Sequence, residues 1–304
     1  MIEGRIWCFW EPSDGIHGYL ELCLATWQAL GREVTILDNS SLPQYLSRKE
    51  MRLLTRNQHF YSLPQYADAV RVMILHRYGG IWMDVDTIVV DPARFRRVEQ
   101  LKQEAELLMI ERHTGWIWAS KNSHIIKLWY KKLVTKINFD KYKLGRDNLL
   151  RKYWRVIKFA KYSLCNEPNK IQELANYINR PSVDWDYLGN SILDDLIDAA
   201  DKKQYRSLTE TAPYHNFIPE SAIWEKKYRD DPNKPKKYSD FYFAKKVKDT
   251  GVFKDSFIVC LHNSWTPSQY KRMSAEDFIQ SGVLMAELFR KIIRKRTGRD
   301  NLKT

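Results

Sequence analysis

The sequence predicts an α/β fold built on a Rossmann-like mixed sheet, with a helical subdomain as an insertion. Residues 5–10, 19–30 and 34–37 have the patterns of a strand, a helix and a second strand, which together make a βαβ opening. Residues 62–90 contain a further helix followed by a strand, and residues 121–200 are largely helical in pattern. Alternation of strands and helices is typical of a sheet that is covered by helices.

The opening unit differs from that of a dinucleotide-binding domain. Gly31 stands where a left-handed residue closes a helix, and residues 38–40 have the composition of a turn after the second strand. The junction of the first strand and helix, residues 11–15, has the sequence EPSDG, whereas NAD-binding folds have GxGxxG there. The sequence therefore does not support an NAD-binding Rossmann domain.

A helix is predicted to begin after Ser62. The sequence SLPQ at this point is a capping-box pattern with proline in the first helical turn. Asp68 and Arg71 lie three residues apart and project together from the helix. Gly79 and Gly80 are predicted to end it.

The following strand, predicted over residues 81–90, is interrupted by Asp84 and Asp86. At positions i and i+2 of a strand the two carboxylates face the same side. Carboxylates in a buried strand require a cationic partner. Two of them can hold a divalent cation through oxygen, which suits Mn²⁺ or Mg²⁺ better than Zn²⁺. A second Asp-x-Asp triplet, at residues 184–186, lies in a helical, tryptophan-rich segment.

Three regions are expected along the chain. Residues 1–120 form a strand-rich region with the first Asp-x-Asp triplet. Residues 121–250 form a largely helical acceptor-side region, and residues 251–304 form a C-terminal region. Residues 225–248 are predicted to form an exposed surface loop. In the C-terminal region we expect a strand at residues 256–261 and a final helix at residues 275–296.

Composition limits the class of protein. Fifty basic residues against 37 acidic ones give a net charge of +13, which attracts polyanions without specifying which. The four cysteines form no CxxC pair, so neither a disulfide scaffold nor a cysteine zinc site is indicated. No apolar run is long enough for a membrane span. We expect a soluble chain without an export signal in a reducing, cytoplasmic compartment.

Two segments carry a resemblance to a known family. Residues 66–71 have the sequence YADAVR, and residues 76–86 have the sequence HRYGGIWMDVD. The Asp, Arg, Gly-Gly and DxD at these offsets resemble the signature of DxD glycosyltransferases of the sugar-binding-region type (family 32-like), which include bacterial capsular polysaccharide synthesis transferases. Residues 6–10, IWCFW, and 261–265, LHNSW, resemble the first strand and the C-terminal metal-side strand of these enzymes. The resemblance implies a GT-A fold and a retaining transfer from a nucleotide sugar.

The resemblance also implies a donor site. Phe9, Trp10 and Trp82 would lie at the donor, with Trp10 stacked on the nucleobase. Asp68 would hold hydroxyls of the donor sugar or ribose, and Trp265 would pack over the donor. Taken singly, aromatic residues in apolar strands are more often core residues than stacking surfaces.

A metal and catalytic site follows from the same resemblance. Asp86 would ligate Mn²⁺ or Mg²⁺ directly, and Asp84 would contact the metal shell or the donor ribose. Arg71, the third expected catalytic residue, would meet the donor phosphate or sugar, since its planar fork suits phosphate oxygens. His262 and Ser264 would complete the metal and pyrophosphate site. Which of these two side chains and the intervening asparagine binds the metal stays open.

The implied partners are a nucleotide-sugar donor and a glycan acceptor. A UDP-hexose is the favoured donor, and GDP-mannose stays open. Acceptors of the capsule type are built on lipid carriers at the inner leaflet of the plasma membrane. The run at residues 289–296, FRKIIRKR, carries five positive charges around a small apolar stripe, which predicts an interfacial helix on anionic lipid. The alternative is a solvated helix face.

Two other functions are compatible with single features of the sequence. A metal-dependent nuclease or phosphatase could use Asp84 and Asp86 with His262. A basic nucleic-acid-binding protein would fit the net charge, but no helix-turn-helix, RRM, KH or zinc-finger pattern supports it, and no specific nucleic-acid partner is expected.

Overall fold

The computed structural model describes residues 4–57, 61–165, 187–201, 203–208, 231–245 and 253–297. Its centre is a six-stranded sheet with the strand order β2-β1-β3-β6-β5-β7. The strands of this sheet are β1 (Ile6–Phe9), β2 (Val34–Leu37), β3 (Gly80–Met83), β5 (Leu107–Ile110), β6 (His113–Ala119) and β7 (Tyr205–Ser207). A second, two-stranded sheet pairs β4 (Thr87–Val89) with β8 (Ile258–Cys260) in antiparallel fashion.

The large sheet is mixed. Strand β1 pairs in parallel with both β2 and β3, whereas β6 runs antiparallel to β3 and to β5. Strand β7 then pairs in parallel with β5 at the edge. This arrangement confirms the predicted α/β fold class and agrees with the GT-A fold that the resemblance implies.

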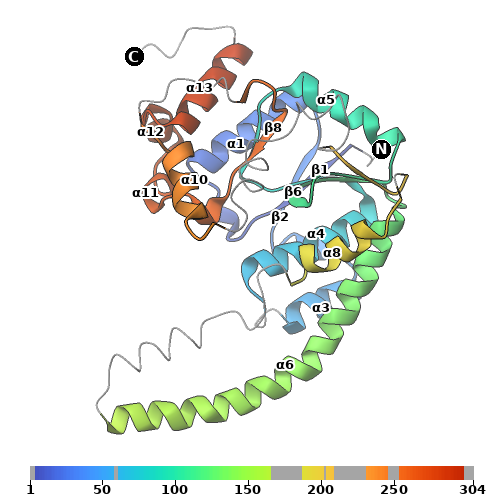
Figure 1. Ribbon diagram of the computed structural model, residues 1–304, viewed down its shortest axis with the longest axis vertical. Coiled ribbons are helices and arrows are strands. Elements are labelled where there is room, and N and C mark those ends of the chain that lie inside the picture. Colours follow the sequence, from blue (N-terminus) through green and yellow to red (C-terminus); the bar gives the residue numbers. More distant parts are fainter. Residues whose placement is uncertain are drawn as a thin grey trace.

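Helices cover both faces of the sheet (Figure 1). One face is covered by α2 (Leu42–Tyr45), α3 (Arg48–Asn57), α4 (Leu63–Tyr78), α6 (His124–Leu164) and α8 (Asn190–Asp198). The small sheet and the remaining helices cover the other: α1 (Tyr19–Trp27), α5 (Pro92–Gln100), α10 (Lys234–Tyr242), α11 (Ser268–Lys271), α12 (Ala275–Gln280) and α13 (Leu284–Thr297). Alternate strand residues supply the two cores, so that Trp7 and Trp82 face the α4 layer while Cys8 and Met83 face the α1 layer.

The predicted βαβ opening is confirmed. Strand β2 has the predicted bounds, and β1 occupies residues 6–9 of the predicted 5–10. The helical segment is α1 followed by one turn of 3-10 helix, Gln28–Leu30. Gly31 closes it in the left-handed conformation, with φ of 63°.

The predicted limits of α4 are also confirmed. Ser62 and Gln65 form a capping box in which the Ser62 backbone N–H donates to Gln65 Oε1 at 2.8 Å. At the other end Gly79 has φ of 65° and donates its N–H to the carbonyl of Leu75. A Cβ on Gly79 would lie 2.5 Å from the backbone nitrogen of Lys121, so the chain passes too closely there for any side chain.

Replacing Gly79 by alanine is therefore expected to lower the free energy of unfolding by roughly 2 kcal/mol or more, because left-handed strain and a backbone collision add. Gly31→Ala is the control for a positive φ alone, since Gly31 has φ of 63° and ψ of 31°, in the left-handed helical region, and open space around its Cβ position. Gly79 has ψ of −156°, a conformation that is adopted almost only by glycine, so its replacement adds further backbone strain to the collision. Urea denaturation of both variants measures the difference. Equal costs would show that neither the collision with Lys121 nor the ψ of Gly79 contributes.

The prediction of a single strand at residues 81–90 is wrong. The chain forms β3, turns, and enters the second sheet as β4. The Thr87 N–H donates to the Asp84 carbonyl at 3.0 Å, which closes a tight turn around Val85 and Asp86. The two acids therefore lie in a turn between two sheets, and strand alternation does not set their directions.

Two predictions for the second half of the chain are also wrong. Of the loop predicted at residues 225–248, the structure describes residues 231–245, and the rest lies outside the described residues. Residues 231–245 are not an exposed loop, because α10 lies there and buries Tyr238 and Tyr242 completely. Its proline occupies the first helical turn, where the missing N–H costs nothing. The final helix is broken into α12 and α13 at Gly282, which has φ of 71°.

The apolar stripe of the C-terminal helix belongs to the core. Phe289 and Ile292 of α13 are 0% and 5% exposed and pack among the residues of the α1 layer. The predicted interfacial helix, with this stripe in lipid, is therefore wrong for the folded chain. Within the described residues no helix is long and apolar enough to cross a membrane.

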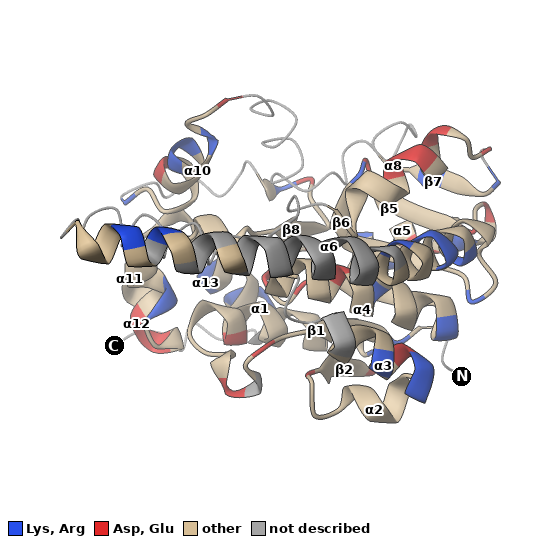
Figure 2. Ribbon diagram, turned by 90° about the horizontal axis from the view of Figure 1, so that it is seen from below, with Lys and Arg blue, Asp and Glu red and all other residues tan. Residues whose placement is uncertain are grey.

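The helical middle region contributes α6, a 41-residue helix that projects beyond the sheet and its covering helices (Figure 1). In the view of Figure 2, described lysines and arginines lie on α3, on α10 and on the projecting end of α6.

The second Asp-x-Asp triplet, residues 184–186, lies outside the described residues. The division into three regions stays a prediction, although β7 of the middle region extends the large sheet.

Candidate functional site

The candidate site lies at one edge of the large sheet. Strands β1 and β3 are parallel neighbours, so the residues after their carboxyl ends, Trp10 and Asp84, come to the same edge. Strand β6 is antiparallel to β3, which brings its first residue, His113, to that edge as well. The carboxyl ends of parallel strands at such a position are the usual place for a ligand in α/β proteins.

Asp84 is fixed by three contacts. Its N–H donates to the carbonyl of Gly115 at 2.9 Å. Its Oδ1 accepts a hydrogen bond from Arg71 at 3.0 Å and another from the indole N–H of Trp82 at 2.8 Å. The side chain stays 39% exposed, so one carboxylate is held in place while remaining open to a ligand.

Arg71 connects the two predicted acids of this half of the site. It is 4% exposed and ion-pairs with Asp68 and with Asp84. Its guanidinium also lies 5.1 Å from the centre of the Trp82 ring. Burial alone would lower the pKa of Arg71, but the charges of the two aspartates outweigh burial and raise it. The predicted pair on one helix face is therefore a buried, permanently charged bridge.

Asp68 lies against the middle region of the chain. Its side chain is 14% exposed, between Arg71 and the first residues of α8. A Cβ on Gly189, the N-cap of α8, would lie 2.5 Å from Asp68 Oδ2. The amino end of a helix favours a carboxylate, because its free N–H groups carry partial positive charge. Because residue 189 is a glycine, the start of α8 can pack directly against the Asp68 side chain.

Asp86 is held from the opposite face of the sheet. It is 9% exposed, and its Oδ2 accepts a hydrogen bond from the backbone N–H of Asn263 at 2.8 Å. The Asn263 side chain in turn accepts from the Tyr19 hydroxyl at 2.6 Å. Burial, and after it the negative charge of Asp84, raise the pKa of Asp86 to about 7. The site thus places two carboxylates so that the charge of Asp84 opposes the ionisation of Asp86.

This donor set fits a divalent cation that is shared with a substrate. A cation beside Asp84 and Asp86 would offset both the burial and the repulsion that raise the pKa of Asp86. Within the described residues, no group of three or more His, Cys, Asp and Glu side chains is arranged to hold a metal. Mg²⁺-type sites commonly use one or two carboxylates together with substrate phosphates and water, and two carboxylates meet that need.

The structure does not bring His262 into a three-ligand set with the two aspartates. Its ring lies 4.2 Å from the Trp265 ring and 5.5 Å from the Tyr238 ring. Its backbone N–H donates to the Tyr238 hydroxyl at 3.0 Å. Burial, followed by the nearby charges of His113 and Lys234, lowers the pKa of His262 well below its ordinary value, so the imidazole is neutral at pH 7.

The other two residues predicted in this segment lie in the 3-10 helix Asn263–Trp265. Ser264 is exposed, and Trp265 is half-buried. The Lys234 ammonium of α10 lies 4.9 Å from the Trp265 ring centre. Helix α10 therefore packs beside the C-terminal segment that contains Trp265. The sequence predicted an exposed loop in place of this helix.

The three aromatic residues predicted at the donor differ in their exposure. Trp82 is 1% exposed and Phe9 is 7% exposed, and both pack in the α4 layer. A bound donor has almost no surface of these rings to contact, so direct donor binding by Phe9 and Trp82 is not supported. Through its hydrogen bond, Trp82 instead positions Asp84. Trp10 is half-buried and retains a surface for stacking.

His113 is a site residue that the sequence patterns did not identify. Its ring lies 5.8 Å from the His262 ring. A Cβ on Gly115 would lie 2.6 Å from His113 Cε1 and 3.1 Å from Asp84 Oδ2, so that glycine leaves room for both side chains. No local pattern marks His113, because only the antiparallel pairing of β6 with β3 brings it beside Asp84.

Comparison with known proteins gives a family for the chain. No curated protein matches it. Among solved structures, PaToxG glycosyltransferase is 16% identical with a TM-score of 0.31, over 63% of this chain and 78% of that chain. The ligand-free glycosyltransferase domain of the YGT toxin is 11% identical with a TM-score of 0.34, over 85% of this chain and 71% of that chain.

The family described as capsular polysaccharide synthesis protein matches residues 1–245. This span includes the large sheet, Arg71, the turn with Asp84 and Asp86, and α10. Since the match extends over most of the 304 residues, the chain belongs to the capsular polysaccharide synthesis protein family.

Proposed function

We propose that this chain is a metal-dependent, retaining glycosyltransferase of capsule or surface polysaccharide synthesis. It would transfer a hexose from a nucleotide sugar, with a UDP-sugar favoured, to a glycan acceptor. The observation that carries the proposal is the pair Asp84 and Asp86, held from opposite faces of the sheet at the edge where ligands bind. The family match supports a role in polysaccharide synthesis.

In this proposal Asp86 and Asp84 hold Mn²⁺ or Mg²⁺, and the donor diphosphate supplies further oxygen ligands. The cation would neutralise the charge that develops on the diphosphate leaving group, a contribution of several kcal/mol. The backbone N–H of Asn263 fixes the orientation of Asp86 before a donor arrives. His262 and Ser264 belong to the wall around the diphosphate rather than to a preformed metal cage.

Arg71 acts in this proposal as a positioning residue. Its two terminal nitrogens already bind Asp68 and Asp84, so its observed contacts hold Asp84. The direct contact of Arg71 with the donor phosphate stays a prediction. Asp68 lies where α8 closes over the sheet, and we propose that it recognises donor hydroxyls at that boundary.

The reaction breaks the bond between the anomeric carbon and the diphosphate oxygen and forms a bond from that carbon to an acceptor hydroxyl, whose proton is released. Retention of configuration follows from the resemblance alone. Proton NMR of the first product formed measures the configuration directly. An inverted anomeric carbon would remove the retaining part of the proposal and leave the transfer itself intact.

Thermal unfolding with nucleotides tests the donor site first. UDP, GDP, CMP and their sugars are each added with and without Mn²⁺. A ligand present at about 100 times its Kd stabilises the folded state by about 2.7 kcal/mol, which raises the Tm by several degrees. We expect a shift with uridine nucleotides that requires Mn²⁺. If no nucleotide changes the Tm under either condition, the transferase proposal fails.

A nuclease or phosphatase is the competing function for the same carboxylates. Cleavage of a nucleic acid or phosphomonoester that depends on Mn²⁺, without stabilisation by nucleotide sugars, would favour it. A nucleic-acid-binding protein would bind duplex or single strands of nucleic acid at physiological salt. Binding that disappears at that salt concentration reflects the net charge alone.

The cytoplasmic location, at the inner leaflet beside a lipid-linked acceptor, stays a prediction.

His113 gives a test that no family pattern suggested. Replacing it by alanine is expected to reduce kcat/KM roughly 10- to 100-fold, the usual effect of removing a neighbour of a metal-binding carboxylate. Stability should change little, because His113 is half-buried at the start of a strand. His124→Ala, at an exposed position, is the control. Equal activities of the two variants would remove His113 from the site.

A further inference from the structure

The half of α6 that projects beyond the sheet carries exposed apolar side chains. Tyr153, Ile157 and Leu164 are 73%, 66% and 88% exposed, and they are three of the five large apolar side chains that are exposed in the described part of the chain. Ala160 is exposed as well. At about 100° per residue, these four side chains lie within about 60° around the helix axis and extend over about three turns. These four residues form the α6 stripe.

The described core does not cover the α6 stripe. In the first part of α6, Ile126, Trp129 and Leu133 are buried and belong to the core of the α4 layer. Ile137 is the last described residue of α6 in that core. Beyond Ile137 the helix continues for about 40 Å, at 1.5 Å per residue, away from the sheet (Figure 1). The stripe therefore needs a partner outside this core if its apolar surface is to leave water.

Helix α6 is also strongly basic. Its sequence contains twelve lysines and arginines against two aspartates. Lys161 is exposed and lies about 40° from Ile157 around the helix axis, so it borders the α6 stripe. Figure 2 shows described cationic residues on the projecting end of the helix. The helix therefore attracts an anionic partner while it presents apolar surface.

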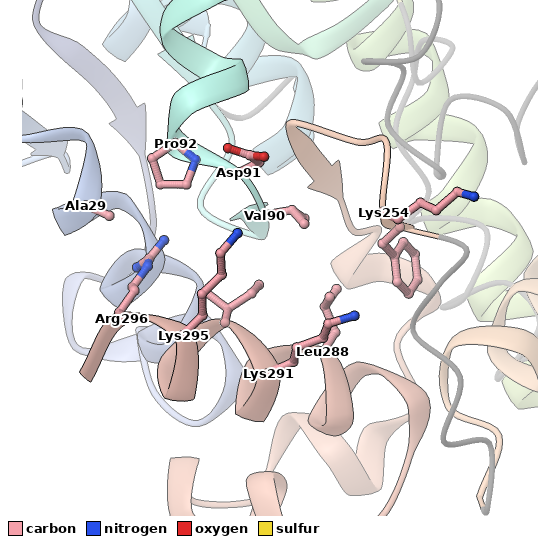
Figure 3. Close-up of a pocket in the computed structure, with 11 residues that line it drawn as sticks. Ala29, Val90, Asp91, Pro92, Lys254, Leu288, Lys291, Lys295 and Arg296 are labelled. Atoms are coloured by element: carbon pink, nitrogen blue, oxygen red, sulfur yellow. The ribbon is translucent and has the colours of Figure 1, made fainter. Parts of the chain in front are cut away.

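The C-terminal helix α13, which is basic too, offers charge without apolar surface. Lys291, Lys295 and Arg296 of this helix line a pocket (Figure 3). Leu288 and Ile292, which belong to the same lining, are 2% and 5% exposed. A lipid chain would have almost no surface of these side chains to contact. Helix α6 differs because its apolar side chains are more than half exposed.

We propose that the projecting half of α6 lies on an anionic membrane surface, with the α6 stripe in the lipid and the cations at the headgroups. A helix with an apolar face and many lysines and arginines binds in the plane of such an interface. Within the described residues no helix is apolar enough to cross a membrane, so α6 lies on the surface. The proposal does not depend on the proposed function of the donor site.

Charge and area exclude the other classes of partner. A second copy of the chain would bring an equally basic α6 against the first, and the like charges would repel. Nucleic acid would neutralise the cations but leave the α6 stripe in water. A stable protein interface takes roughly 20–30 residues on each side, more than one face of this helix supplies. An anionic lipid surface satisfies both the charge and the apolar side chains.

Sedimentation of the full chain with lipid vesicles tests the proposal. The vesicles contain phosphatidylserine and phosphatidylcholine in equal amounts, and vesicles of phosphatidylcholine alone are the comparison. We expect at least about tenfold weaker binding to the neutral vesicles, because the headgroup charge is absent. Binding to the anionic vesicles should weaken as added salt screens the charges. Equal binding to both kinds of vesicle, or binding to neither, would overturn the proposal.

Glutamine variants locate the binding surface. Replacing Tyr153, Ile157 and Leu164 together by glutamine keeps the net charge and is expected to weaken binding to the anionic vesicles at least about tenfold. The control replaces Ile36 and Leu63, the other two large apolar residues that are exposed in the described part of the chain, and should bind as the wild type does. Far-UV circular dichroism verifies that both variants are folded. Wild-type affinity in the stripe variant would mean that charge alone binds the vesicles, and the proposal would fail.

A fluorescent label gives a second readout in a chain without substitutions. Cys165 follows Leu164 directly and is exposed, whereas the other three cysteines are buried, so a thiol-reactive NBD group attaches selectively at Cys165. We expect the emission of this group to rise and shift to the blue with anionic vesicles, because the end of α6 moves from water into the membrane interface. Unchanged emission while the chain sediments with the vesicles would contradict the placement of α6.

Sedimentation equilibrium without lipid tests for a second copy as the partner. The wild type and the stripe variant are expected to have the same mass. An assembly that the stripe variant loses would assign the α6 stripe to a contact between copies and overturn the proposal. Asp86→Asn should bind the anionic vesicles as the wild type does, so a failure of the proposed transferase activity leaves this result unaffected.

Discussion

Replacing Asp86 by asparagine is expected to lower the rate of sugar transfer at least about a thousandfold. Loss of the cation that neutralises the leaving group would cost several kcal/mol, and each 1.4 kcal/mol corresponds to about a factor of ten in rate. Asparagine has the same shape and keeps an oxygen that can accept the Asn263 N–H. The Mn²⁺-dependent stabilisation by a nucleotide should disappear in the same variant.

The fold of this variant gives an independent readout. The folded-state pKa of Asp86 lies above its unfolded value, so protonation of the carboxylate stabilises the fold. That contribution is complete below the unfolded pKa of about 4 and is lost as the pH rises through about 7. In metal-free protein at pH 8, Asp86→Asn is therefore expected to be as stable as the wild type or more stable.

The control is Asp240→Asn, at an exposed position of α10. It should leave both transfer and the nucleotide-induced shift unchanged. Transfer rates and urea denaturation with and without EDTA provide the two measurements. An Asp86→Asn protein with wild-type turnover would contradict the assignment of Asp86, and one that is inactive because it is unfolded would contradict the predicted gain in stability.

Replacing Arg71 by methionine is expected to lower the free energy of unfolding by about 3–5 kcal/mol. The guanidinium is 4% exposed and is shared by Asp68 and Asp84, so its removal leaves uncompensated negative charge beside Asp86. Methionine keeps an apolar stem of similar length but removes the guanidinium that lies 5.1 Å from the centre of the Trp82 ring. The loss therefore measures the guanidinium, with its ion pairs and its ring contact, rather than the packing of the stem.

A further variant separates the electrostatic contribution. With Asp68→Asn and Asp84→Asn already present, Arg71→Met should cost less than half of its cost in the wild type, because the charges that it compensates are absent. Arg272→Met, at an exposed position, is the control and should change stability by about 0.5 kcal/mol at most. An equal cost of Arg71→Met in both backgrounds would mean that packing, not charge, is what Arg71 provides.

The sequence by itself determined those elements whose signals are local. The capping box at Ser62, the left-handed Gly31 and the two-glycine end of α4 depend on neighbours within a few residues, so their patterns predicted the bounds correctly. The α/β fold class also followed from the first strand, helix and strand. The DxD triplet and the Asp68 and Arg71 pair were identifiable because their residues lie within one helix and one turn.

Only the tertiary structure decided what depends on distant partners. Residues 81–90 divide between two sheets because β4 finds its pairing strand in β8, far along the chain. Strand pairing also brings His113 to Asp84, and packing buries both α10 and the apolar stripe of α13. Local patterns record the polarity of a residue and its spacing from near neighbours. Contacts between segments far apart in the sequence depend on register and packing, which those patterns do not contain.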